Sequence, residues 1–95
     1  MKAHIKLSDN YGFGKCWNLV VTIKKKVKSF YLGQDSKFCS RVLGMETAYV
    51  VQQIGTRDIN EGTKGNKKLA NFIIETLELD AKKLEALQPW ELSCQ

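Results

Sequence analysis

The spacing of apolar residues changes once along this chain, near residue 33, and this change constrains the fold most strongly. Before it, apolar and polar residues alternate, as they do in strands with one buried face. After it, apolar residues recur at the three- and four-residue intervals of amphipathic helices. The 95 residues are enough for one domain with a conventional core. We therefore predict a single α+β domain over residues 1–95, with a sheet in 1–32 and helices in 35–95.

The sheet is predicted to be a three-stranded antiparallel meander. Residues 1–8 alternate, 15–24 contain the strongest strand pattern, and 27–32 form the returning strand after a tip at Lys25 and Lys26. The residues predicted to face the core are Ala3, Ile5, Leu7, Trp17, Leu19, Val21, Ile23, Phe30 and Leu32. Four lysines are predicted on the opposite, outer face: Lys2, Lys6, Lys24 and Lys28.

About four helices are predicted after the sheet. The first carries an apolar stripe of Phe38, Cys39, Val42 and Leu43, the second one of Val50, Val51 and Ile54, and the third one of Leu69, Ala70, Phe72, Ile73, Ile74 and Leu77. The predicted caps are Asp35 or Ser36, then Thr47, Asn66 and Asp80. Residues 56–65 are predicted to be a loop, and the tail 89–95 fits either a strand or a helical turn.

Neither a catalytic centre, a cofactor nor a metal site is predicted. The single histidine, His4, has no carboxylate at a fixed spacing to orient it. Cys16, Cys39 and Cys94 are widely spaced and form no metal-ligand pairs, which favours free buried thiols in a reducing cytoplasm. The sequence also lacks an apolar run long enough to span a bilayer, so no membrane partner is predicted.

Positive charge is concentrated in the first half of the chain. Residues 1–44 have a balance of +7 and residues 45–95 a balance of −2, which together give the +5 of the whole chain. A basic surface of this kind favours a polyanionic partner, because lysines release counterions from a phosphate backbone. Lysines that only keep an exposed sheet face soluble are an equally good explanation.

Residues 35–55 form two short amphipathic segments around one glycine. Leu43 precedes Gly44 and Met45 follows it, while Val50 and Ile54 lie six and ten residues further on. This stretch resembles the helix-turn-helix of Cro-like and phage-repressor-like DNA-binding proteins, in which a leucine, a turn glycine and buried aliphatic residues have this spacing.

The resemblance implies a homodimeric transcription regulator that binds duplex DNA through a recognition helix over residues 45–54. Base contacts are then expected from Thr47, Ala48, Tyr49 and Gln52. Backbone contacts are expected from Lys37, Arg41, Arg57 and the hairpin lysines Lys24, Lys25, Lys26 and Lys28. The chain departs from the family pattern at Glu46, an acid close to the expected phosphates, and at Val51, which is apolar where the family is usually polar.

Two other functions fit the same sequence. One is a protein-binding module or inhibitor, for example a phage-borne one, that covers an acidic or nucleic-acid-mimicking partner with its lysine face or with the tail around Trp90. The other is RNA or single-strand binding by the lysine-rich hairpin, with the helices purely structural.

Overall fold

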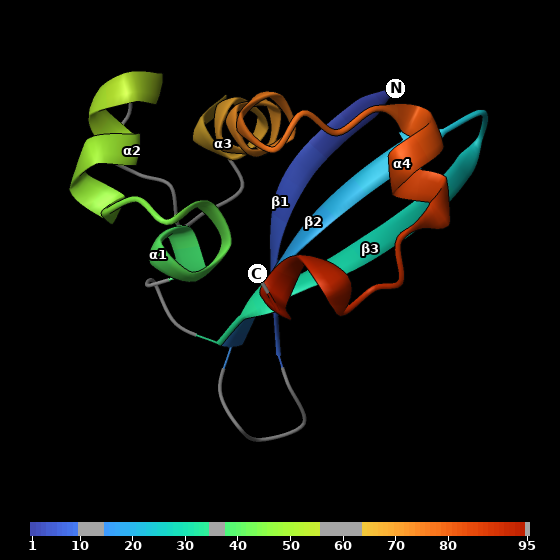
Figure 1. Cartoon of the computed structure of the whole chain (residues 1–95), viewed down its shortest axis with the longest axis horizontal. Coiled ribbons are helices and arrows are strands. Elements are labelled where there is room, and N and C mark those ends of the chain that lie inside the picture. Colours follow the sequence, from blue (N-terminus) through green and yellow to red (C-terminus); the bar gives the residue numbers. More distant parts are fainter. Residues whose placement is uncertain (10–14, 35–37, 56–63, 95) are drawn as a thin grey trace.

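A computed structural model of the protein describes residues 1–9, 15–34, 38–55 and 64–94. Three strands come first: β1 (Lys2–Asp9), β2 (Lys15–Ile23) and β3 (Lys26–Gly33). The helices follow: α1 (Phe38–Leu43), α2 (Thr47–Ile54), α3 (Lys64–Thr76), α4 (Ala81–Ala86) and the 3₁₀ helix η1 (Glu91–Cys94). The prediction of an α+β fold with an N-terminal meander and a helical layer is confirmed (Figure 1).

The strands pair antiparallel in the order β1-β2-β3. Ile5 lies opposite Leu19, and Leu19 lies opposite Phe30, so these three side chains share one face of the sheet. All three are at most 1% exposed. The residues that alternate with them define the other face, which we call the outer face. Its members are Lys2, His4, Lys6, Ser8, Cys16, Asn18, Val20, Thr22, Val27, Ser29 and Tyr31.

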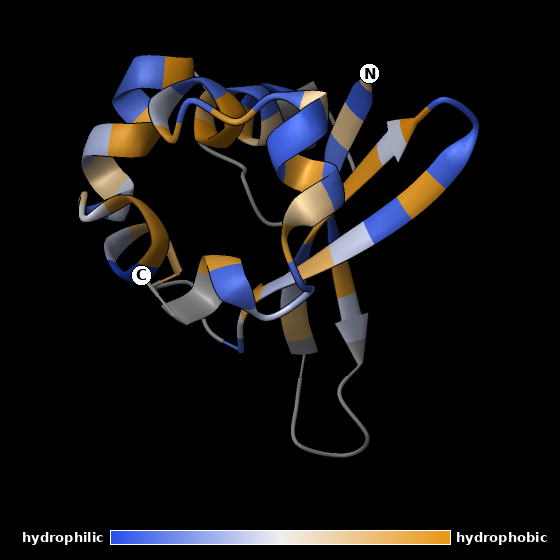
Figure 2. Ribbon diagram, turned by 45° about the vertical axis from the view of Figure 1, so that its right-hand side comes forward, coloured by the Kyte–Doolittle hydropathy of each residue, from blue (hydrophilic) through white to orange (hydrophobic). Residues whose placement is uncertain are grey.

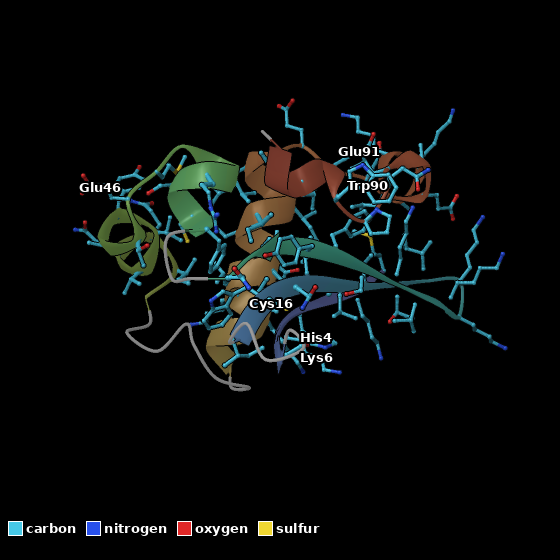
Figure 3. The ribbon with its side chains drawn as sticks, turned by 90° about the horizontal axis from the view of Figure 1, so that it is seen from below. His4, Lys6, Cys16, Glu46, Trp90 and Glu91 are labelled. Carbon is cyan, nitrogen blue, oxygen red and sulfur yellow. The ribbon has the colours of Figure 1, made fainter. Side chains whose placement is uncertain are left out.

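The described helices lie on one side of the sheet, away from the outer face (Figures 1 and 3). Helix α3 packs against β1, and η1 packs against β3 and α1. Helices α1 and α3 and the 3₁₀ helix η1 contact the sheet, whereas α2 contacts α1 and α3. Figure 2 shows apolar and polar residues interspersed along the helices. The buried helical residues are Phe38, Cys39, Val42, Val50, Leu69, Ala70, Ile73, Ile74, Leu84 and Leu92. The predicted core is therefore confirmed on both layers.

Two helix starts differ from the prediction, and one agrees with it. Glu46, not Thr47, is the extended residue that precedes α2. Helix α3 begins at Lys64, two residues before the predicted cap Asn66. Asp80 does cap α4, where its side chain accepts a hydrogen bond of 2.8 Å from the backbone N–H of Lys83. The predicted caps Asp35 and Ser36 lie outside the described residues.

The C-terminal tail is helical and is attached to the sheet at the free edge of β3. The backbone N–H of Tyr31 donates a 2.8 Å hydrogen bond to the carbonyl oxygen of Pro89. Leu92 in η1 is fully buried against the core. Among the described helices, none combines the length and the apolar character that a bilayer crossing requires.

Candidate nucleic-acid interface

The corner between α1 and α2 depends on a left-handed glycine. Gly44 has φ of +69°, and its N–H donates a 3.0 Å hydrogen bond to the carbonyl oxygen of Ser40. This is the hydrogen bond of an αL helix end, where a residue with a Cβ would be strained. Gly55 ends α2 in the same way, with φ of +69° and a 3.0 Å bond to Val51. The predicted role of Gly44 is confirmed.

Thr47 was predicted to contact bases, but its side chain hydrogen-bonds Cys39 of α1. Thr47 is half-buried and hydrogen-bonds the thiol of Cys39. Burial raises the pKa of the Cys39 thiol to about 11, and the hydrogen bond from Thr47 opposes this shift. The thiol is therefore protonated and unreactive at neutral pH. Thr47 is consequently less available to a ligand than the other residues predicted to contact bases.

The rest of the predicted reading face of α2 is exposed. Ala48, Gln52 and Gln53 are exposed, and Tyr49 keeps 49% of its surface accessible. Val50, on the opposite side of the helix, is fully buried. Helix α2 therefore presents one polar side to solvent at the end of the molecule farthest from the β2–β3 hairpin tip (Figure 1).

The charge around α2 is not favourable to phosphate. Glu46 is exposed at the start of the helix, where Figure 3 shows it at the same end of the molecule as α2, and α2 has no lysine or arginine. Arg41 is exposed, but its guanidinium lies against the α-carbon of Gly33, where a larger residue would collide with it. Lys37 and Arg57, the other predicted backbone contacts, lie outside the described residues.

The hairpin tip is shifted by one residue from the prediction. The turn residues are Lys24 and Lys25, while Lys26 pairs with Ile23 and begins β3. Both turn residues have positive φ, of 50° and 69°, which is the geometry of a type I′ turn. All three lysines are exposed. The tip and α2 lie at opposite ends of the molecule in every view (Figures 1, 2 and 3).

Lys28 does not lie on the outer face, so its predicted placement is wrong. It has the same alternation as Phe30, and it points to the side of the sheet that the helices cover. Its Nζ donates hydrogen bonds of 2.8 Å and 2.9 Å to the carbonyl oxygens of Leu84 and Glu85 at the end of α4. It also lies 5.3 Å from the centre of the Phe30 ring. Lys28 therefore stabilises the fold by satisfying carbonyl groups at a helix C-terminus.

Lys2 and Lys6 lie on the outer face as predicted, with His4 between them along β1. All three are exposed. Figure 3 shows His4 and Lys6 on the side of the sheet opposite the helices. The alternation of apolar and polar residues in β1 was enough to place Lys2 and Lys6 on the outer face. They were not among the residues predicted to bind nucleic acid. What the sequence could not provide was the position of the described helices, which lie on the other side of the sheet (Figure 3).

Metal and thiol chemistry have little support in the described part of the chain. It contains no group of three histidine, cysteine or carboxylate side chains that could hold a metal ion. Cys16 and Cys39 are free thiols, and both are buried as predicted. They lie on opposite sides of the sheet. The amide of Asn18 donates a 3.5 Å hydrogen bond to the sulfur of Cys16.

The structure thus divides the predicted binding residues between two surfaces. Ala48, Tyr49 and Gln52 lie on one of them, and Lys24 and Lys25 on the other. Lys26 pairs with Ile23 and therefore has the alternation of the covered face, like Lys28. Comparisons of the chain with protein-family models, with curated proteins and with solved structures find no match.

Proposed function

We propose that this protein is a DNA-binding protein that reads duplex DNA with helix α2. The observation that carries the proposal is the exposed polar side of α2, which is held behind a left-handed glycine corner and backed by the fully buried Val50. A helix with one free polar side fits the major groove, which is about 12 Å wide.

Three side chains supply chemistry that bases can recognise. The amide of Gln52 matches the N6 and N7 atoms of adenine, and the methyl group of Ala48 suits the methyl group of thymine. Tyr49 adds a hydroxyl group and an aromatic ring, which is half exposed. Arg41, Lys37 and Arg57 flank this helix along the chain and are the proposed phosphate contacts.

The acidic start of α2 predicts weak binding by one copy. Glu46 is exposed, and α2 carries no cation to offset it. Phosphate contacts provide most of the affinity of DNA-binding proteins, so a single copy of this surface would bind weakly. A homodimer on paired half-sites would compensate, and a regulator of transcription in the cytoplasm is the role that this arrangement fits.

Selection from a randomised duplex pool tests the proposal. We expect the wild-type protein to enrich a short motif, and Gln52→Ala to lose about 1–3 kcal/mol of preference at one base pair. Glu46→Gln should strengthen binding to all sequences alike, because it removes a negative charge near the phosphates. Asn71→Ala is the matched control, since Asn71 is an exposed amide on α3. A pool without enrichment, or equal effects of Gln52→Ala and Asn71→Ala, would contradict the proposal.

A second function, protein binding, is favoured by one observation. Trp90 keeps 59% of its surface exposed although it lies next to the buried Leu92 segment. Exposed tryptophans are common anchors in protein interfaces. The same selection separates the two functions, because a protein-binding module would enrich no DNA motif.

A further inference from the structure

The outer face of the sheet is basic and free of described carboxylates. Lys2, His4 and Lys6 lie on the outer face along β1. The tip residues Lys24 and Lys25 lie near the end of β1 at which Lys2 is found, because Lys2 pairs with Thr22. Six exposed carboxylate side chains lie in the helical layer and its connections: Glu46, Glu75, Glu78, Asp80, Glu85 and Glu91. The helical layer therefore mixes both signs of charge, including the exposed Lys67 and Lys68 of α3, whereas the outer face carries lysines without a described carboxylate.

Four lysines and His4 form a row along β1 and the tip, which we call the basic track: Lys6, His4, Lys2, Lys24 and Lys25. Lys2 pairs with Thr22, which is two residues before the tip, so β1 leads toward the tip. Lys6 pairs with Asn18, six residues before Lys24. At about 3.3 Å per residue the track is roughly 20 Å long.

Within the described part of the chain, the lysines of the track make no side-chain hydrogen bond. Lys28, by contrast, donates to two carbonyl oxygens of α4. Lys2, Lys6, Lys24 and Lys25 have no ion-pair partner among the described side chains, and all four are exposed. Their charge is therefore available to a ligand.

The hairpin tip supplies a second, independent observation. Type I′ turns favour asparagine and glycine, because both central residues have positive φ. Here the two positions hold Lys24 and Lys25, with φ of 50° and 69°. Strained backbone positions of this kind are retained more often where the side chains have a function. Two lysines at this turn place positive charge at the end of the track in spite of the backbone cost.

We propose that the basic track binds single-stranded nucleic acid, as a surface separate from α2. Strands lie about 4.8 Å apart, so a three-stranded face with its side chains is wider than the two-stranded ribbon that a major groove admits. A single strand can follow the track with its phosphates on the lysines. Its bases then lie over the neutral part of the face, where Tyr31 pairs with Asn18 and offers an aromatic ring for stacking.

Fluorescence anisotropy with a labelled oligothymidine of about 15 nucleotides, near the upper end of known site sizes, tests the proposal. The double variant Lys2→Gln/Lys6→Gln should weaken binding and reduce the slope of log K against log salt by about 1.4, because each lost phosphate contact removes about 0.7. Lys67→Gln/Lys68→Gln is the matched control, since it removes the same charge from exposed positions on α3. The control should leave the slope nearly unchanged.

Several results would overturn the proposal. Equal losses for both double variants would show that only net charge matters. Tighter binding to the duplex of the same sequence, or to vesicles containing phosphatidylserine, with the same dependence on Lys2 and Lys6 would assign the track to a different partner. Gln52→Ala should not affect oligothymidine binding, so failure of this proposal and failure of duplex reading by α2 are distinguishable.

Discussion

Lys25 and Lys28 show that lysines three residues apart can serve different purposes. Lys28 shares its alternation with the buried residues Phe30 and Leu32, so it must extend over the covered side of the sheet. It reaches two carbonyl oxygens at the end of α4, whereas Lys25 is exposed at the tip. The alternation of β3 therefore contains enough information to separate Lys28 from the binding surface.

Replacing Lys28 tests this assignment. Lys28→Met keeps an apolar stem of similar length but leaves the carbonyl groups of Leu84 and Glu85 without their donor. We expect the free energy of unfolding to fall by about 1–3 kcal/mol in urea titrations, with oligothymidine binding little changed. Lys25→Gln, which removes an exposed charge, should do the reverse. A Lys28→Met variant as stable as the wild type would contradict the structural role.

At the scale of elements, the sequence predicted the strands and helices well where apolar spacing was regular. The strands, the stripe of α3 and the glycine corner all follow directly from residue type and spacing. The cap of α2 was wrong because Thr47 uses its side chain to bond Cys39, a contact that depends on tertiary packing. The tip was wrong by one residue because two lysines give no turn signal.

The hairpin turn predicts opposite effects on stability and binding. Lys24→Asn/Lys25→Gly places preferred residues at the two positions with positive φ. We expect the free energy of unfolding to rise by about 1 kcal/mol and oligothymidine binding to weaken. Thermal unfolding and anisotropy measure the two effects.

Lys24→Gln/Lys25→Gln is the control for this variant, because it removes the same charge without relieving the backbone. It should weaken binding with no gain in stability. If the Asn-Gly variant bound single strands as well as the wild type, the tip would not belong to the basic track.

At the scale of the whole molecule, the sequence predicted the candidate residues but not their grouping. Charge and exposed polar residues can be counted along the chain, and both α2 and the hairpin were identified in this way. Their separation by the length of the molecule follows from how the helices pack on the sheet (Figure 1). Packing of this kind is a long-range property that local patterns do not specify.

The two proposed surfaces, α2 and the basic track with its hairpin tip, lie apart in the structure (Figure 1). The two proposals together predict that a duplex and a single strand bind without competing. Trp90 lies on the helical side of the sheet, away from His4 and Lys6 (Figure 3), and it is the residue on which the second proposal, protein binding, depends.

Amide chemical-shift mapping of the ¹⁵N-labelled protein, with a selected duplex and an oligothymidine added separately, can decide whether α2 and the basic track bind different nucleic acids. We predict that the duplex perturbs Ala48, Tyr49 and Gln52, whereas the single strand perturbs Lys2, His4, Lys6 and the hairpin tip. Perturbation of one common surface by both ligands, or a duplex that leaves α2 unperturbed, would contradict the account.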